Sequence, residues 1–494
     1  MSVLVYAVDV GTTNVKVVLY DEVLTRLAVA SAEAQYSRSG NRVEFDPAGL
    51  FELVLGLIAE CAGAVHGTVG QDAVISLTGQ AESLVLNDSA GSPVRPAMSW
   101  LDDRATAEAA ELGAHFGDDE AFAITGEPFP SATWPAAKLR WLRRHEPETL
   151  AATHEVLMVK DDLVRRFTGT AAGELTTRGF TYFWNVPAGE YWDDMLAFCG
   201  VPDDSLPQVV PAGTDLGPVA SAVERRLPPA RSYRLNAGAL DHFAAMVGTG
   251  SYAPGVVSES AGTVLSLSML DTEWSFDTAT KVSFHPSLDA RGTLLFSGAD
   301  SGGVALEWYR REGLDGMTFA DLEKSLSART VATAEAPIFL PYLTGINPPD
   351  FHPSARGAFL GLELGHDRID LAYAVEEGIA HLLRRNVDYL GGSVREIVST
   401  GGGADSPFWS QLKADVCNVG VLVPDEREAT CRGAAVLALV AAGELASLSD
   451  AAALSQPAVS RFRPSPSPER EARYRLFDDY LHRLYPSASE TENR

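Results

Sequence analysis

The stretch AVDVGTTNVKVVLYDE at residues 7–22 decides the fold of this chain. An apolar run leads to Asp9, and a second apolar run begins beside Lys16. Between them, Gly11 tolerates positive φ and lets the backbone approach a ligand closely. Successive backbone amides in such a turn can bind an anion. The segment is therefore either a phosphate-binding hairpin or an ordinary hairpin with a polar turn.

The side chains around this turn suit a nucleotide. Thr12 and Thr13 supply hydroxyl donors, and Asn14 follows them directly. Lys16 adds a nearby cation. Asp9 stands at the end of the first strand, where a carboxylate could hold a hydrated Mg²⁺.

A second hairpin with the same pattern begins the second half of the chain. VVSESAGTVLSLSML at residues 256–270 runs from an apolar strand through an acidic residue to Gly262 and Thr263, and then into another apolar strand. SYAPG at residues 251–255 precedes it and is the candidate connection between domains. A duplicated phosphate-binding hairpin explains this repetition better than two accidental turns.

A polar elbow separates two further strands. VISLT at residues 74–78 is expected to be a buried strand, and LVLND at residues 84–88 resumes after the elbow. Gln80, Glu82 and Ser83 place three hydrogen-bonding side chains at this strand end. Ligands of α/β proteins bind at strand ends, which makes the elbow a candidate substrate site.

Two other segments each admit a structural and a functional interpretation. Trp100, Asp102 and Arg104 lie close together in MSWLDDRA, as either a surface loop with an ion pair or a ligand contact. Asp241 and His242 stand where a loop of small residues becomes an apolar helix. An aspartate at that position is either an N-cap or a functional group.

The remaining pattern is that of an α/β protein. Asp46 and Pro47 predict the start of a helix, and residues 133–168 are expected to be helical. Residues 397–416 read as a strand, three glycines and a helix, an arrangement that suits a nucleotide or phosphate. Residues 456–470 are expected to form an extended surface segment, followed by a terminus that frays.

Length and charge restrict the function further. A chain of 494 residues exceeds one hydrophobic core, so two or more domains are expected. The 39 basic and 66 acidic residues argue against nucleic-acid and anionic-membrane partners. The 4 cysteines form no CxxC pair and suit a reducing cytoplasm. No signal peptide or membrane-length apolar run is apparent, so a cytoplasmic location is expected.

Taken together, these segments resemble the FGGY carbohydrate kinases, which belong to the superfamily of actin, sugar kinases and heat-shock ATPases. The resemblance spans residues 3–445, and its motifs occur in the family's order. They are DVGTTNVK (9–16), TGQAES (78–83), WLDDRA (100–105), GALDHFAAMVGTG (238–250), ESAGTV (259–264) and STGGGADSPFW (399–409).

The resemblance implies an α/β fold with two ribonuclease-H-like (actin-like ATPase) domains and a cleft between them. Each domain would contain a five-stranded mixed sheet flanked by helices. The expected division is residues 1–247 for sugar and phosphate binding and residues 248–450 for ATP binding. Residues 451–494 would form an extension that is helical and then frayed.

The resemblance also implies the roles of the site residues in an ATP-dependent, Mg²⁺-requiring kinase. Asp241 would be the general base and, with Asp9, a metal ligand. The sugar would contact Gln80 and Glu82, with Trp100, Asp102, Phe129 and His242 nearby. ATP would contact Gly11, Thr12, Thr13, Asn14, Lys16, Gly262, Thr263, Gly303, Gly402, Gly403 and Ala404.

Two departures from the family pattern affect this expectation. Glu376 stands where the C-terminal signature has an apolar residue. The elbow Gln-Ala-Glu-Ser matches neither the Gln-Met-His-Gly of xylulokinase-like members nor the Gln-Arg-Glu of glycerol kinases. The acceptor therefore stays open, with a ketose such as a pentulose favoured over glycerol or an alditol.

Two functional classes stay as alternatives. One is a non-catalytic or filament-type ATP-binding protein of the same superfamily, which would not need Asp241 or the elbow. The other is a nicotinamide dehydrogenase, whose glycine fingerprint is missing here. The partner expected for a kinase is a small sugar or polyol, and a homodimer is compatible with the sequence.

Overall fold

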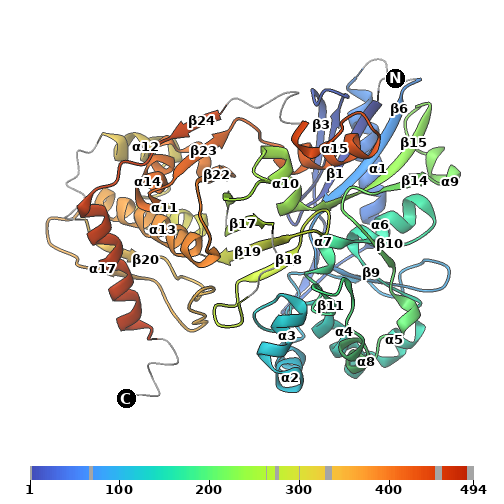
Figure 1. The fold of residues 1–494 in the computed structure, drawn as a ribbon, viewed down its shortest axis with the longest axis horizontal. Coiled ribbons are helices and arrows are strands. Elements are labelled where there is room, and N and C mark those ends of the chain that lie inside the picture. The colour runs from blue at the N-terminus through green and yellow to red at the C-terminus, as the bar shows by residue number, and fades with distance from the viewer. Residues whose placement is uncertain are drawn as a thin grey trace. The chain divides into compact units, whose positions relative to one another are not determined.

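A computed structural model describes residues 3–65, 70–262, 264–272, 277–299, 301–328, 336–450 and 459–486 (Figure 1). The chain divides into two compact units. The first comprises Met1–Tyr252, Asp271–Leu294 and Glu428–Gln456, and the second comprises Ala253–Leu270, Leu295–Arg427 and Pro457–Arg494. The break after Tyr252 falls within the SYAPG segment, as expected.

The first unit is built on a mixed sheet whose strand order is β14-β15-β6-β1-β2-β3. β1, β2 and β3 form an antiparallel meander, whereas β6 and β15 run parallel to β1. The hairpin predicted around Gly11 is therefore confirmed. The strands are β1 (Val3–Val10), β2 (Asn14–Tyr20), β3 (Arg26–Glu33), β6 (Asp72–Gly79), β15 (Ser232–Leu240) and β14 (Asp215–Pro218).

The helix α1 (Pro47–Gly63) begins as the sequence predicts, because the Asp46 carboxylate accepts a hydrogen bond from Ala48 N at 3.0 Å. Its buried face, including Phe51, Val54 and Ile58, joins the same hydrophobic core as β1, β2 and β6. The core of the first unit thus lies directly beneath the strands that end at the Gly11 turn.

A smaller sheet in the same unit, β4-β5-β8-β7-β9, carries the elbow. The prediction that residues 133–168 form helices separated by Pro and Gly is wrong at Glu155–Met158, which form β9 and pair antiparallel with β7. The all-apolar run VLM fits a buried strand as well as a helix. The elements are β4 (Ser37–Ser39), β5 (Arg42–Phe45), β7 (Leu84–Asn87), β8 (Ala97–Met98), α4 (Pro135–His145), α5 (Pro147–Ala152) and α6 (Val159–Thr168).

Shorter elements complete the first unit. Several of them pack into a second core around Leu112, Phe122 and Met195. They are α2 (Thr106–Phe116), α3 (Asp118–Thr125), β10 (Ala172–Glu174), α7 (Leu175–Arg178), β11 (Trp184–Asn185), β12 (Glu190–Tyr191), α8 (Asp193–Cys199), β13 (Gln208–Val210), α9 (Ser221–Glu224) and β18 (Ser283–Pro286).

The helix α15 (Ala429–Ala441) packs against α10 (Asp241–Thr249) in the first unit, although the sequence division assigned it to the second domain (Figure 1). The two helices approach closely because each has a glycine that lies against the backbone of the other. A Cβ on Gly433 would lie 1.7 Å from Ala244 O, and a Cβ on Gly248 would lie 1.9 Å from Ala429 O. The compact units therefore differ from a simple cut of the chain at residues 247/248.

The second unit repeats the topology of the first. Its strands lie in the order β19-β17-β16-β22-β23-β24, with β16 and β17 antiparallel and β22 and β23 parallel to β16. The second predicted hairpin is thereby confirmed. The strands are β16 (Val256–Ala261), β17 (Leu265–Asp271), β19 (Thr293–Ala299), β22 (Glu396–Thr400), β23 (Gly420–Pro424) and β24 (Val459–Phe462).

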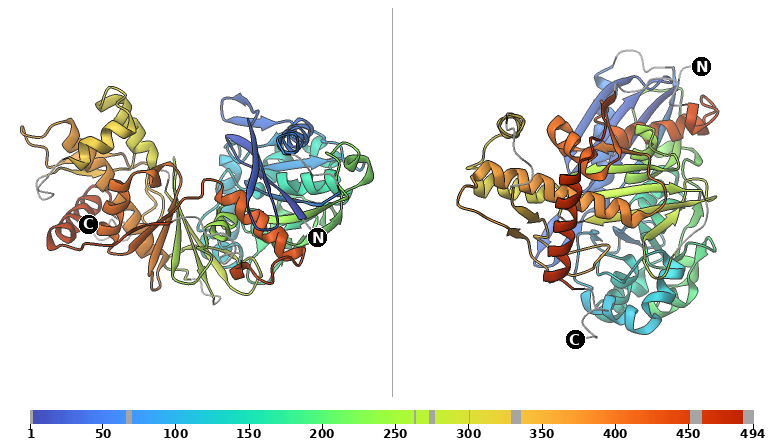
Figure 2. Two further views of the ribbon diagram at one scale, coloured as in Figure 1. Left: turned by 90° about the horizontal axis from the view of Figure 1, so that it is seen from above. Right: turned by 60° about the vertical axis from the view of Figure 1, so that its left-hand side comes forward.

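The prediction that residues 456–470 are an extended surface segment is confirmed for β24, an exposed strand that pairs antiparallel with β23, and is wrong at residues 468–470, which begin a helix. The C-terminal helix α17 then lies against α13 and α14 (Figure 2). The predicted frayed end, residues 487–494, lies outside the described residues. The elements are α11 (Gly303–Gly313), α12 (Phe319–Ser327), β20 (Ile338–Leu340), β21 (Ala358–Leu360), α13 (Arg368–Leu390), α14 (Pro407–Cys417) and α17 (Pro468–Leu484).

Glu376, the departure from the family signature, is buried within α13. Its Oε2 atom has no hydrogen-bond partner in the described part of the chain. Burial and the charge of Glu323 raise the pKa of Glu376 to about 8, although Lys413 opposes this shift. The neighbouring Glu377 is buried too, but Arg473 Nε donates to both of its carboxylate oxygens at 2.9 Å.

We expect Glu376→Leu to stabilise the protein and Glu377→Leu to destabilise it. A raised pKa means that ionising Glu376 costs more in the folded state than in the unfolded state. The unfolding free energy therefore falls as pH rises from the pKa of Glu376 in the unfolded chain to its folded pKa of about 8. Above that range, Glu376→Leu should add roughly 1–4 kcal/mol to the unfolding free energy, whereas Glu377→Leu should cost roughly 3–5 kcal/mol. Denaturant titrations between pH 5 and 9 measure both, and a Glu376→Leu effect independent of pH would contradict the burial argument.

Candidate active site

The first candidate phosphate site is the tight turn between β1 and β2. A Cβ on Gly11 would lie 2.8 Å from Asn14 O, so this turn requires glycine. Trp100 Nε1 donates to Thr12 Oγ1 at 2.8 Å, which brings two of the predicted site segments together. Thr13 and Asn14 are exposed at the turn and leave their side chains open to solvent.

Asp9 lies at the base of this turn among other charged groups. Burial and the charge of Asp241 raise the pKa of Asp9 to about 7, and the charge of Lys16 opposes this rise. Lys16 Nζ lies 2.6 Å from Glu428 Oε2, so its ammonium group is already paired. Sequence reasoning missed Glu428, because no local pattern links it to a lysine on the first hairpin.

The Asp9 and Asp241 carboxylates fit a divalent cation. Asp9 Oδ1 is buried without a hydrogen-bond partner in the described residues. The charge of Asp241 raises the cost of ionising Asp9, which a cation would relieve. The described residues contain no cluster of three or more potential metal ligands. A Mg²⁺ here would therefore take its other ligands from water and phosphate, as this ion usually does.

Asp241 is the first residue of α10, and the N-cap position belongs to Leu240. Asp241 Oδ1 accepts a hydrogen bond from the adjacent His242 N at 2.7 Å and does not cap a later amide of the helix. The Asp241 side chain is 30% exposed, and His242 Nε2 lies 4.0 Å from Asp241 Oδ1. The N-cap interpretation is thus not supported, and the carboxylate is open to a ligand.

The elbow is held in an unusual backbone conformation. Glu82 has φ of 64°, which is in the left-handed region. Buried Lys138 donates from Nζ to Glu82 O at 3.1 Å and to Ser99 O at 2.8 Å, and so ties the elbow to the Trp100 loop. Burial raises the pKa of Glu82 to about 7, and the charge of Asp241 acts in the same direction. Burial also lowers the pKa of Lys138 to about 8.

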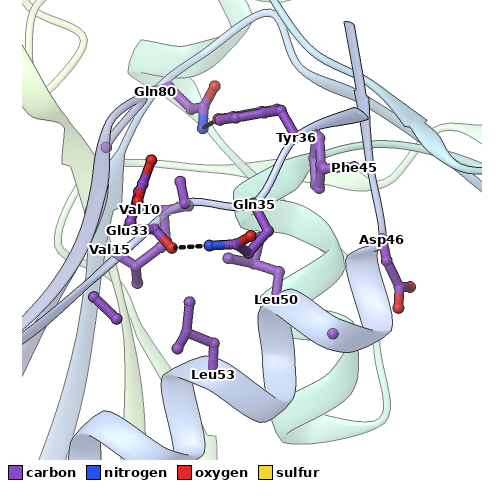
Figure 3. Close-up of a pocket in the computed structure, with 14 residues that line it drawn as sticks. Val10, Val15, Glu33, Gln35, Tyr36, Phe45, Asp46, Leu50, Leu53 and Gln80 are labelled. Atoms are coloured by element: carbon purple, nitrogen blue, oxygen red, sulfur yellow. Dashed lines mark hydrogen bonds between the residues drawn. The ribbon is translucent and has the colours of Figure 1, made fainter. Parts of the chain in front are cut away.

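Gln80 lines a pocket whose lining does not include Glu82. Gln80 Nε2 donates to Tyr36 Oη at 3.2 Å, and Gln80 Oε1 accepts from Ser83 Oγ at 2.8 Å. Figure 3 shows Gln80 and Tyr36 above the apolar side chains of Leu50 and Leu53. This pocket encloses about 550 Å³, and Asp241 is not part of its lining. These two bonds use one N–H donor and one acceptor site of the Gln80 amide, which leaves one of each for a ligand.

Asp102 does not offer a free carboxylate, contrary to the expectation that it binds the sugar. Asp102 is fully buried; Oδ2 accepts from Val43 N at 2.7 Å and Oδ1 accepts from Arg104 Nε at 2.8 Å. Arg104 Nη2 also donates to Glu44 Oε1 at 2.6 Å. We therefore assign Asp102 a structural role in this loop. Phe129, by contrast, is 43% exposed.

A buried polar cluster beside the elbow was not predicted from the sequence. Ser283 Oγ donates to Glu127 Oε2 at 3.1 Å and lies 3.1 Å from His285 Nε2. Burial and the charge of Glu82 hold the pKa of Glu127 well above its usual range. Burial lowers the pKa of His285 to about 3, so this imidazole is neutral. Ser283 and His285 lie together in β18, but Glu127 comes from a distant segment, and no sequence motif connects it to β18.

The second unit gathers the predicted nucleotide residues at one end of its sheet. Gly262 follows β16, and Gly303 N donates to Gly262 O at 2.9 Å. A Cβ on Gly303 would lie 2.5 Å from Gly262 O, and one on Gly403 would lie 3.0 Å from Ala261 Cβ. Gly402 and Ala404 lie in the short helix after β22. The glycines thus keep this strand end free of side chains, while Thr263 lies outside the described residues.

Comparison with known proteins identifies the class. Residues 4–248 match the N-terminal domain of the FGGY family of carbohydrate kinases, and residues 261–442 match its C-terminal domain. The chain is 27% identical over 460 residues to a xylulose kinase of Bacillus subtilis, covering 91% of this chain and 90% of that one.

Solved structures show the same fold. A xylulose kinase from Rhodospirillum rubrum matches with a TM-score of 0.89 and 26% identity, covering 98% of this chain and 99% of that one. A gluconate kinase from Lactobacillus acidophilus matches with a TM-score of 0.90 and 23% identity, covering 99% and 100%.

This chain therefore belongs to the FGGY family of carbohydrate kinases. It has the two-domain actin-like ATPase fold, and it is a sugar kinase that uses ATP as the phosphate donor. The dehydrogenase and non-catalytic alternatives are set aside by this membership. None of the described helices combines the length and hydropathy that a membrane span requires.

Proposed function

We propose that this kinase transfers the γ-phosphate of ATP to a hydroxyl of a neutral ketose, with a pentulose as the favoured acceptor. The observation that carries the proposal is the acidity of the elbow. Glu82 and Asp241 interact electrostatically, so two carboxyl groups act on the acceptor side of the elbow. Hydroxyl groups can donate hydrogen bonds to these oxygens.

The same acidity disfavours a sugar acid. Among the described residues, Lys138 is the cation whose charge acts on Glu82, but two of its three donors bind main-chain carbonyls. An acceptor carboxylate such as that of gluconate would meet Glu82 and Asp241 without a dedicated cation, and like charges repel. Similarity to both a xylulose kinase and a gluconate kinase leaves these two acceptors to be distinguished.

In the proposed reaction, Asp241 accepts the proton of the attacking sugar hydroxyl as the bond to phosphorus forms. Asp9 and Asp241 would hold Mg²⁺, which neutralises charge on the phosphates when bound. Backbone amides at Gly11–Asn14, with Lys16, would bind phosphate oxygens. Gly262, Thr263, Gly303, Gly402, Gly403 and Ala404 would contact the nucleotide.

The acceptor is tested by measuring ADP release over a panel of D-xylulose, D-ribulose, D-fructose, xylitol, glycerol and D-gluconate. We expect the highest kcat/KM with a ketopentose. Gluconate should be poorer by about tenfold or more, which corresponds to roughly 1.4 kcal/mol of unfavourable charge interaction. A panel in which gluconate is the best acceptor would contradict the proposal.

A further inference from the structure

We infer that a buried hydrogen-bond chain from Lys160 through Glu174 and Thr176 to the amide of Leu240 positions the carboxylate of Asp241. This inference rests on the proposed function, in which Asp241 is the general base. Thr176 acts through the main chain and does not touch a substrate, so it is a positioning residue.

Three hydrogen bonds form the chain. Lys160 Nζ donates to Glu174 Oε2 at 3.2 Å, and Thr176 Oγ1 donates to the same oxygen at 2.8 Å. Leu240 N then donates to Thr176 Oγ1 at 2.9 Å. An ionised glutamate can only accept, so the hydroxyl proton of Thr176 points to Glu174 and a lone pair faces the Leu240 amide.

The chain is sealed from solvent. The exposed fractions are 1% for Lys160, 3% for Glu174, 0% for Thr176 and 2% for Leu240. Glu174 is further fixed because its Oε1 accepts from Thr176 N at 2.6 Å, as the N-cap of α7. A buried polar chain with every member bonded is rigid, and losing one member leaves others without partners.

The strand before Asp241 needs such an anchor. β15 shifts register against β6 between Asn236 and Ala239, and Gly238 has φ of 59°. A Cβ on Gly238 would lie 1.6 Å from Leu77 O, so the strand is bent against its neighbour. Irregular strand pairing redirects the residues that follow. Thr176 fixes the main chain after this irregularity, at the residue directly before Asp241.

The test compares Thr176→Val, which removes the hydroxyl at nearly constant volume, with Thr176→Ser, which keeps it. Because displacements of about 1 Å can cost about 100-fold in rate, Thr176→Val should lower kcat by roughly 10- to 100-fold. The KM for ATP should stay near the wild-type value, and Thr176→Ser should restore most of the rate. Thr177→Val is the matched control, since Thr177 is equally buried but its hydroxyl donates to Glu174 O.

Hydrogen exchange gives a readout independent of activity. The peptide containing Leu240 should exchange faster in Thr176→Val than in wild type, Thr176→Ser or Thr177→Val. A Thr176→Val variant with wild-type kcat, or one whose loss Thr177→Val reproduces, would overturn the inference.

A double-mutant cycle separates this inference from the proposed function. If Thr176 acts through Asp241, Thr176→Val should not lower the residual rate of Asp241→Asn any further. Additive losses would overturn the positioning role while leaving Asp241 as the base. If Asp241→Asn alone keeps the wild-type rate, the proposed function fails and the positioning role fails with it.

Discussion

Asp241→Asn should lower kcat by roughly 10²- to 10⁴-fold, which is the usual contribution of a general base. The amide keeps the shape of the carboxylate but cannot accept the proton of the sugar hydroxyl. The sugar KM should change by less than tenfold, since the elbow and its Lys138 anchor are untouched. The structure favours this outcome because Asp241 lies at the start of α10 with a carboxylate that is 30% exposed and accepts a hydrogen bond only from the adjacent amide of His242 among the described residues.

The appropriate control is Asp193→Asn. Asp193 is also the first residue of a helix, α8, and also leaves the N-cap position to its neighbour. Asp193→Asn removes a negative charge from a helix N-terminus, as Asp241→Asn does, and so measures the effect of losing that favourable interaction alone. If Asp241→Asn retains more than about a tenth of the wild-type kcat, the decrease in rate is smaller than the contribution of a general base. Asp241 is then not the base.

Glu82→Ala should lower kcat/KM for the preferred sugar by about 10- to 150-fold, from roughly 1.5–3 kcal/mol for a hydrogen bond to a charged group. The structure makes Glu82 more than a solvated residue at the rim. Its left-handed backbone is held by Lys138, and burial raises its pKa to about 7. ATP hydrolysis without sugar should hardly change, because the Gly11 turn is unaffected.

Glu82→Gln separates a sugar contact from a structural one. Above pH 7 the wild-type carboxyl is increasingly ionised and purely an acceptor, whereas the amide turns one acceptor into a donor. Glu82→Gln should therefore be impaired most at high pH and least below the pKa of Glu82. Glu33→Gln serves as the control, since Glu33 is exposed at the rim of the neighbouring pocket. If Glu82→Ala and Glu82→Gln both keep the wild-type kcat/KM for every sugar in the panel, Glu82 does not determine acceptor specificity.

The elements that could be predicted are those whose signals are local. Apolar runs on both sides of Gly11 and Gly262 predicted two hairpins, and Asp46 with Pro47 predicted the start of α1. A strand and its adjacent turn are defined by neighbouring residues, so periodicity is sufficient. The duplication of the sheet followed from the repeated pattern, and the structure confirms it.

The features that could not be predicted depend on distant residues. Glu428 pairs with Lys16 across 412 positions, and α15 reaches the first unit through glycine contacts with α10. The burial of Asp102 could not be predicted, because an aspartate near an arginine in sequence is typical of an exposed ion pair. It depends on residues distant in sequence, since Val43 N bonds to Asp102 and Glu44 bonds to Arg104. The chain from Glu174 to Leu240 joins two segments whose sequences carry no common motif.

The identity of the phosphate acceptor tests the central claim most directly. Wild-type protein, ATP, Mg²⁺ and D-xylulose are incubated together, and mass spectrometry counts sugar phosphate while an enzyme-coupled assay counts ADP. The proposed mechanism predicts one sugar phosphate for each ADP, and almost none of either product with Asp241→Asn. ADP released without sugar phosphate, or no turnover with any ketose in the panel, would contradict it.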